Sequence, residues 1–218
     1  MCLSWCKGFR RQCGQILTGV KFELKNLIIH LQIEEGKLLS GGRIDTYSIH
    51  MKELEIFEYS TYPKDRLELV IDDELMRLEE SVDYIFVKQE RRYINLDNVF
   101  FREPGYVVTG LKLSVDPENF ESLQLAVHIT PFDFDSGSLT PTDDKPSKWI
   151  IYKYMSDEDR KFENRRLVAL QPRIPLEGVS LYYRGKENSA GFVGFRMTTL
   201  DIPAYLDPQM SQQDLEFL

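Results

Sequence analysis

An alternation of apolar and polar side chains with a period of two residues is the feature that most limits the fold of this chain. In the segment GVKFEL at 19–24, the apolar residues Val20, Phe22 and Leu24 are separated by charged ones. Successive side chains of a strand point to opposite faces, so this spacing predicts a strand with one buried face. A chain built from such segments has to bury them by packing strands and sheets against one another.

Further segments along the chain carry the same kind of strand signal. They are residues 44–57, 66–71, 81–87, 111–115, 122–129, 149–155, 178–184 and 191–200. Turn residues separate them at 41–42, 116–119 and 135–137. Many short strands punctuated by turns predict an all-β fold, an antiparallel β-sandwich or a β-prism-like domain.

Helix signals are sparse. The best candidate is DDELMRLEES at 72–81, where Leu75 and Leu78 are three residues apart behind acidic residues suited to a first helical turn. We therefore expect at most one short helix in the domain.

A strand-like heptad occurs twice and, in weaker form, a third time. Aligned on a glycine, the copies are ILTGVKF at 16–22, VVTGLKL at 107–113 and PLEGVSL at 175–181. A polar turn and a second apolar strand follow each copy, so each unit predicts a β-hairpin. Repeated units of this kind share a core that no single unit can bury alone, which predicts internal pseudo-repeats of hairpin units.

The glycine of each copy lies inside its predicted strand. Gly19, Gly110 and Gly178 occupy matching positions. A glycine within a strand often marks a β-bulge or a place where another backbone approaches closely. We therefore assign these three glycines a structural role.

The length of 218 residues suits one domain with a sizeable core. We expect a single β-rich domain over 15–209, a cysteine-rich remnant or flexible tail at 1–14, and a flexible tail at 210–218. Lys and Arg number 27 against 35 Asp and Glu, a net charge of −8. Because the basic clusters are short, we expect no nucleic-acid partner. No stretch approaches the ~20 apolar residues of a transmembrane segment.

The cysteines are crowded at one end of the chain, at Cys2, Cys6 and Cys13. An odd number of cysteines so close together cannot form a closed disulfide framework, and their spacing is a poor zinc pattern. The first residues also lack the apolar core of a signal peptide. We interpret this end as the edge of a longer cysteine-rich region or as a free-thiol tail.

The acidic segment PFDFDSGSL supplies the best candidate metal ligands. Asp133 and Asp135 are predicted on one face of a strand, with Gly137 in the turn that follows. Two such carboxylates could contribute to a calcium site, which needs six to eight oxygen ligands. The segment lacks the EF-hand spacing, so further ligands would have to come from elsewhere, and solvated outer-face aspartates are the alternative.

Histidine and tyrosine provide weaker candidates. His30 and His128 lie in corresponding second strands of two units, where a metal or catalytic pair could form, although strand histidines more often only complete a hydrogen bond. Tyr182 and Tyr183 are adjacent, so one of them is expected to be exposed as a platform for a sugar ring. No G-x-S-x-G nucleophile motif is present, and no cofactor is expected.

Several motifs resemble a family of secreted arthropod proteins that carry a domain of unknown function. They are TGVKF followed by NLIIHLQIEEGKLLSGGRID, the second copy YVVTGLKL with PFDFDSG, and the closing IPAYLDPQ. The resemblance covers about 15–209. It implies a C-terminal domain of a secreted protein, preceded by a cysteine-rich stretch and a signal peptide that this chain lacks. The family has no assigned activity, so no functional residue follows from it.

These observations predict a non-enzymatic extracellular binding or structural module with a protein or glycan partner. The alternative is a hydrolase-type enzyme that uses surface carboxylates such as Asp133 or Asp135. A pocket that contains Asp133 and a histidine, with a raised carboxyl pKa, would favour the enzyme.

Overall fold

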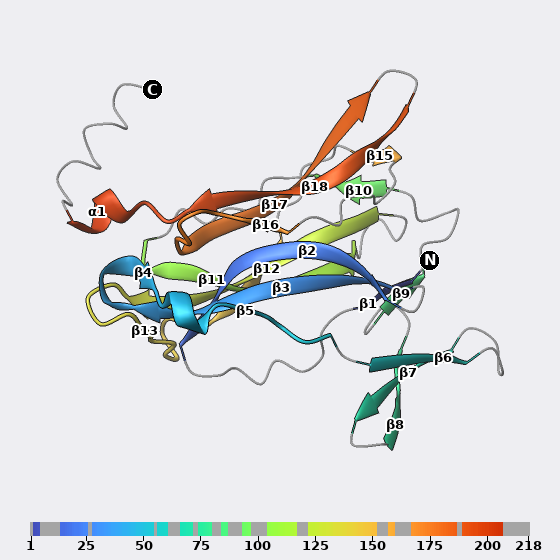
Figure 1. The fold of residues 1–218 in the computed structure, drawn as a ribbon, viewed down its shortest axis with the longest axis horizontal. Helices are drawn as coiled ribbons and strands as arrows, with labels where there is room; N and C mark the ends of the chain where they lie inside the picture. The colour runs from blue at the N-terminus through green and yellow to red at the C-terminus, as the bar shows by residue number, and fades with distance from the viewer. Residues whose placement is uncertain are drawn as a thin grey trace.

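The computed structural model describes residues 2–4, 14–25, 28–54, 56–60, 66–71, 74–79, 84–86, 93–96, 104–116, 122–151, 157–159, 167–186 and 189–206. Most residues in these ranges lie in strands, and the helical elements are two 3-10 turns and one five-residue helix, so the prediction of an all-β fold is confirmed (Figure 1). No helix in them is long and apolar enough to cross a membrane.

The elements follow in chain order. The strands are β1 (Cys2–Ser4), β2 (Gln15–Lys25), β3 (Ile28–Leu39), β4 (Arg43–Ile44), β5 (His50–Met51), β6 (Ile56–Ser60), β7 (Arg66–Ile71), β8 (Glu74–Arg77), β9 (Tyr84–Phe86), β10 (Tyr93–Asn95), β11 (Tyr106–Val115), β12 (Ser122–Asp133), β13 (Ser138–Leu139), β14 (Lys148–Ile150), β15 (Asp157–Asp159), β16 (Val168–Ala169), β17 (Leu176–Lys186) and β18 (Ser189–Thr199). The helical segments are η1 (Ser40–Gly42), η2 (Thr46–Ser48) and α1 (Ile202–Leu206).

These strands form four sheets, and most pairs are antiparallel. One sheet has the order β16-β2-β3-β1-β9, with β4 and β5 also paired to β3. A second has the order β11-β12-β10-β15, with β13 and β14 also paired to β12. Strands β17 and β18 form a two-stranded sheet, and β6-β7-β8 form a three-stranded sheet that stands apart from the long hairpins in Figure 1.

Three long antiparallel hairpins, β2–β3, β11–β12 and β17–β18, form the body of the molecule (Figure 1). In each hairpin the register shifts directly before the glycine of the heptad, at Gly19, Gly110 and Gly178. The residue before each glycine has no ladder partner, which is the arrangement of a β-bulge. The equivalence of the three hairpins as copies of one repeat, like their arrangement as a sandwich or prism, stays a prediction.

Gly19 also lies where another strand comes close. β16 pairs with β2 at this glycine, with Ala169 opposite Gly19. A Cβ atom at Gly19 would lie 3.0 Å from the Cβ of Ala169 and 3.2 Å from that of Glu34. A larger residue would therefore crowd β16 against β3.

The main hydrophobic core is shared by the three hairpins. Its fully buried residues include Leu17 from β2, Val108 from β11, and Leu176 from β17. The rings of Phe22 and Phe195 meet across this core with their centroids 4.5 Å apart. Each fully buried aliphatic side chain contributes about 1.5–3 kcal/mol, so the hairpins depend on one another for stability.

A second apolar cluster lies where β3 and β12 end. Leu38 and Phe132 are buried in it, and Phe134 packs against it. The ring of Tyr205 from α1 stacks on Phe134 with centroids 4.8 Å apart, and its hydroxyl accepts a hydrogen bond of 2.7 Å from the backbone N–H of Gly105. This cluster fixes the end of the molecule at which β4, β13 and α1 meet (Figure 1).

Two sequence predictions of elements are wrong in detail. The expected strand at 44–57 is divided into β4, η2, β5 and β6, because Asp45 caps a 3-10 turn by accepting a hydrogen bond from Tyr47 N. The expected helix at 72–81 contains strand β8 instead, which pairs with β7 and places Leu75 opposite Val70. Pairing with a neighbouring strand outweighed the weak helix pattern, and the one described α-helix lies at 202–206.

Candidate functional site

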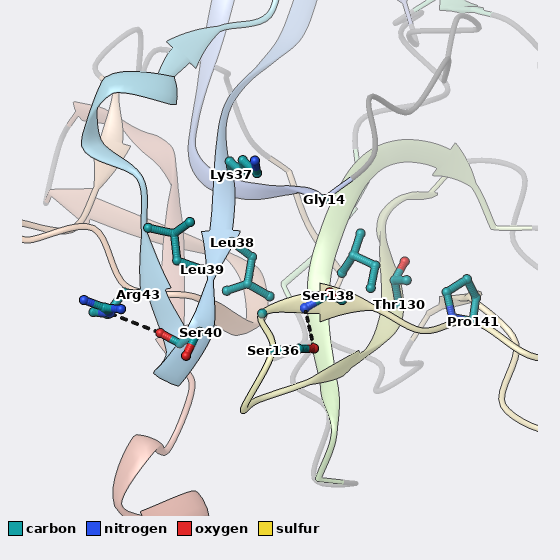
Figure 2. A pocket seen from close by; sticks show the side chains of 12 residues that line it. Gly14, Lys37, Leu38, Leu39, Ser40, Arg43, Thr130, Ser136, Ser138 and Pro141 are labelled. Atoms are coloured by element: carbon teal, nitrogen blue, oxygen red, sulfur yellow. Dashed lines mark hydrogen bonds between the residues drawn. The ribbon is translucent and has the colours of Figure 1, made fainter.

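A pocket of about 750 Å3 lies at the end of the molecule where β3 and β12 finish. Figure 2 shows Lys37, Leu38 and Leu39 on one wall and Ser136 and Ser138 on the other. The walls come from segments about a hundred residues apart in the sequence. The size is that of a small-ligand site, for which roughly 300–1,000 Å3 is typical.

The two walls are held together by backbone contacts that depend on glycine. Gly41 has φ +71° and its N–H donates a 2.8 Å hydrogen bond to the carbonyl of Phe134. Gly137 has φ +69°, and a Cβ atom there would lie 2.5 Å from Ser40 N and 2.6 Å from Leu39 O. The turn after β12 therefore packs directly on the backbone that ends β3, which fixes the width of the pocket.

The pocket lining combines cations, hydroxyl groups and apolar surface. Lys37 and Arg43 are its charged residues, both exposed, and the Nε of Arg43 donates a 3.1 Å hydrogen bond to the carbonyl of Ser40. Ser136 and Ser138 bring hydroxyl groups from the facing turn, and Ser138 N donates to Ser136 Oγ at 3.3 Å. Leu39 adds part of the apolar surface. This lining can pair with an anionic group, hydrogen-bond to hydroxyls and contact an apolar face.

The backbone of Lys37 is hydrogen-bonded to the turn at 45–48. The Oγ of Ser48 accepts a 2.7 Å hydrogen bond from Lys37 N, and the carbonyl of Lys37 accepts one of 2.9 Å from Asp45 N. The same turn carries Tyr47, whose side chain is 99% exposed. The turn is held by several hydrogen bonds, and the exposed ring of Tyr47 on it offers a surface that a ligand can contact.

The predicted calcium ligands lie on the turn next to the pocket. β12 ends at Asp133, and Asp135 lies in the turn beyond it, so the placement of both on one strand face is wrong. The Oδ1 of Asp133 accepts a 2.7 Å hydrogen bond from Ser136 N, and hydrogen bonds from the backbone and side chain of Ser136 lower the pKa of Asp133. Within the described ranges, no group of three or more acidic, histidine or cysteine side chains could hold a metal ion. Calcium binding at Asp133 and Asp135 stays a prediction.

His128 belongs to a buried network at the bulge of the second hairpin. Its Nδ1 lies 2.7 Å from the hydroxyl of Thr109, the residue of the bulge. That hydroxyl also lies 2.8 Å from Thr130 Oγ1, which in turn accepts a 3.2 Å hydrogen bond from Ser147. An imidazole beside a hydroxyl has the parts of a nucleophile and its base, but Thr109 is 4% exposed and already engaged. The network therefore stabilises the bulge.

Trp149 and Lys112 cover this network from outside. The ring of Trp149 meets the imidazole of His128 edge-on at 4.8 Å, and the Nζ of Lys112 lies 4.5 Å from the Trp149 centroid. Burial lowers the pKa of Lys112. Trp149 itself is 39% exposed, so part of its ring borders solvent.

The first hairpin carries a buried ion pair at the matching place. Glu34 lies opposite Gly19, and its carboxylate accepts hydrogen bonds from Arg173 Nε at 2.6 Å and Nη2 at 3.0 Å. The bulge residue Thr18 donates a third, at 2.8 Å. Burial alone would raise the pKa of Glu34, but the hydrogen bonds from Arg173 and Thr18 and the charge of Arg173 lower it overall. This bidentate pair joins β3 to the segment that leads into β17.

The remaining sequence candidates lie elsewhere. His30 is buried in β3, and burial lowers its pKa. Its partner across the ladder is Glu23, whereas the ladder partner of His128 is the heptad glycine Gly110, so the two histidines lie at different positions of their hairpins. The expectation that Tyr182 or Tyr183 is exposed is wrong, because both are half-buried. The ring of Tyr182 packs over Gly194, where a Cβ atom would lie 2.8 Å from it.

Comparison with known proteins identifies no family for this chain. No protein-family model matches the chain, and a search of curated proteins finds no match.

Sequence reasoning missed the pocket residues Lys37 and Arg43. Both are single charged residues that lie between the expected strands and turns, and a single charged residue carries no signal on its own. The available signal was the pair of glycine turns, at 41–42 and 135–137, that bring the two walls together.

Proposed function

We propose that this chain is a non-enzymatic extracellular binding module whose ligand, a glycan or a protein segment, occupies the pocket between β3–β4 and the turn after β12. The observation that carries the proposal is the pocket itself, with cations and hydroxyl groups on walls held by backbone packing at Gly137. Pre-formed pockets with a few polar groups on an apolar surface are typical binding sites.

The state of Asp133 supports binding over hydrolysis. A carboxylic acid that donates a proton at neutral pH needs a raised pKa, usually from an apolar environment or a neighbouring carboxylate. Asp133 is exposed, and hydrogen bonds from Ser136 lower its pKa. This favours a structural task for Asp133 in forming the turn that builds one wall of the pocket.

A glycan-array and pull-down screen tests the proposal when it is run with a variant that fills the pocket. We expect the wild-type chain to bind a defined set of glycans or one protein partner, and Ser138→Trp to abolish that binding by occupying the space between the walls. Thr140→Trp is the matched control, because Thr140 is exposed on the same segment but does not line the pocket. It should bind as the wild type does.

Ser138→Trp and Thr140→Trp together test whether the pocket is the binding site. Equal binding by wild type and Ser138→Trp would overturn the pocket as the binding site. Cleavage of any glycan on the array, lost on replacing Asp133 by Asn, would favour the hydrolase alternative instead.

A further inference from the structure

A chain of side-chain hydrogen bonds connects one wall of the pocket to the imidazole of His128. Ser147 Oγ donates to Thr130 Oγ1 at 3.2 Å, and Thr130 Oγ1 lies 2.8 Å from Thr109 Oγ1. Thr109 Oγ1 lies 2.7 Å from His128 Nδ1. Because Ser147 is the donor at one end, we assign each hydroxyl as donor to the next group. The chain then ends on Nδ1, which accepts only while it carries no proton.

The wall that this chain holds is the segment 138–147. Its pocket residues are Ser138, Leu139 and Pro141. The segment is paired to β12 as β13 at its start, and it ends at Ser147, directly before β14. β14 pairs with β12 at three positions, with Trp149 opposite His128. Since so short a strand makes few backbone hydrogen bonds, the attachment of β14 and of the wall depends on the side-chain contacts around His128.

The surroundings of His128 disfavour a positive charge. Its side chain is 6% exposed. Of the described strands beside it, β11 contributes Lys112 and β14 contributes Lys148, and both are cations. Burial already lowers the pKa of Lys112, whose Nζ lies over the same Trp149 ring that meets His128. Among the acids, Asp133 lies at the exposed end of β12, and those of β15 lie beyond β10, which pairs with the first two residues of β12.

Protonation of His128 has two consequences for these contacts. A proton on Nδ1 makes that atom a donor, so Thr109 has to donate instead to Thr130 or to the carbonyl of His128, which lies 3.4 Å away. The first choice removes the acceptor of the Thr130 hydroxyl, and the second is a long, weak hydrogen bond. The charged imidazole also regains hydration only if its cover moves, and Trp149 on β14 is that cover.

We propose that His128 is a pH switch that holds β14 and the wall at 138–147 on β12 while it is neutral and releases them when it is protonated. An unperturbed histidine takes up a proton near about pH 6.5, so we expect the release in mildly acidic solution. Acid then opens one side of the pocket, because Ser138, Leu139 and Pro141 belong to this wall. The switch goes beyond the proposed function, since it acts on the wall whatever ligand the pocket binds.

Hydrogen–deuterium exchange of the whole chain, followed by mass spectrometry, tests the switch without a ligand. Peptides that cover 138–150 should exchange about tenfold faster at about pH 5 than at about pH 7.5, after correction for the intrinsic exchange rate. Peptides from the third hairpin, at 176–199, contain no histidine and should show no such change.

Histidine variants provide the controls. His128→Gln keeps a hydrogen-bonding side chain but cannot take up a proton in this range, so its wall should exchange equally at both pH values. His50→Gln, at an exposed histidine, and His30→Gln, at a buried histidine of the first hairpin, should keep the wild-type response at 138–150. Thr109→Val breaks the chain between His128 and Thr130, so its wall should exchange fast at both pH values.

Three results would overturn the switch. They are equal exchange of 138–150 at the two pH values in the wild type, a pH response that persists in His128→Gln, and a response of the same size at 176–199, which would mean that acid loosens the whole fold. If His128→Gln does not fold, an NMR titration of the wild type replaces it. The amide shifts of 147–150 should then follow the midpoint of the His128 ring, and a different midpoint would contradict the coupling. None of these results depends on a ligand, so the proposed function keeps its own test.

Discussion

Gly137 is the residue on which the shape of the pocket most directly depends. Its φ of +69° belongs to the left-handed region that side chains other than glycine rarely adopt. A Cβ atom at this position would also collide with the backbone of Leu39 and Ser40. Backbone atoms cannot move aside as the end of a flexible side chain can, so the turn would have to shift away from β3.

We expect Gly137→Ala to lower the free energy of unfolding by about 3 kcal/mol, from the left-handed conformation and the steric overlap together. Gly41→Ala is the matched control, because Gly41 has φ +71° but no atom lies within 4 Å of the place that its Cβ would take. The control should lose only about 1 kcal/mol. Urea unfolding monitored by circular dichroism measures both, and equal losses would show that the close packing at Gly137 contributes little.

At the scale of elements, the pair formed by Glu34 and Arg173 joins two parts of the fold that are distant in sequence. Their side chains are 6% and 12% exposed, and 139 residues separate them. Removing one partner of such a buried pair leaves the other charge uncompensated, which is costly. The pair of Lys21 with Glu23, whose side chains are 23% and 35% exposed, is less buried and contributes far less.

We expect Arg173→Met to cost about 3 kcal/mol near pH 7, against at most about 0.5 kcal/mol for the control Lys21→Met. The pKa of Glu34 is lowered in the folded protein, so its contribution is present above the unfolded pKa and is lost as the pH falls through the folded pKa. In Arg173→Met, burial without the arginine raises that pKa, so protonation relieves the variant. The difference in the free energy of unfolding between wild type and Arg173→Met, measured by urea unfolding, should therefore become smaller towards about pH 3.5. A difference that does not change with pH would show that it comes from packing alone.

Element boundaries also illustrate what a local pattern can predict. The strand predicted at 66–71 has the bounds of β7. Its polar and apolar residues alternate from Arg66 to Leu69, and the β-branched Val70 and Ile71 complete a strand-like segment. The segment 44–57 has similar alternation, but the hydrogen bonds of Asp45 and Ser48 turn the chain at η2. Side-chain capping of this kind competes with strand pairing, and periodicity does not detect it.

At the scale of the whole molecule, α1 ties the end of the described chain to the second hairpin. Tyr205 stacks on Phe134 and accepts a hydrogen bond from Gly105 N, across 100 residues of sequence. Burial is the main cause that raises the pKa of Tyr205, and the charges of Glu177 and Asp201 add to it. The contact closes the end of the molecule beside the pocket.

We expect Tyr205→Phe to cost about 1 kcal/mol near pH 7, because the N–H of Gly105 loses its acceptor while the stacked ring remains. A raised folded pKa means that the contribution of Tyr205 is present below its unfolded pKa and is lost as the pH rises through the folded one. The difference between wild type and variant should therefore narrow in alkaline solution. Tyr47→Phe, at a side chain 99% exposed, should change stability by less than about 0.5 kcal/mol. A cost at Tyr205 no larger than this control would contradict the contact.

Local patterns in the amino-acid sequence were enough to predict the class of the fold and the places of its main strands, because a period of two residues and the turns between strands are local properties. The heptads around Gly19, Gly110 and Gly178 likewise pointed to the three hairpins. The place where a ligand can bind follows from tertiary packing alone. Lys37 and Ser138 line one pocket because Gly137 lets two distant backbones touch. The glycine turns at 41–42 and 135–137 can be read from the sequence, but no local pattern shows that the two turns pack against each other.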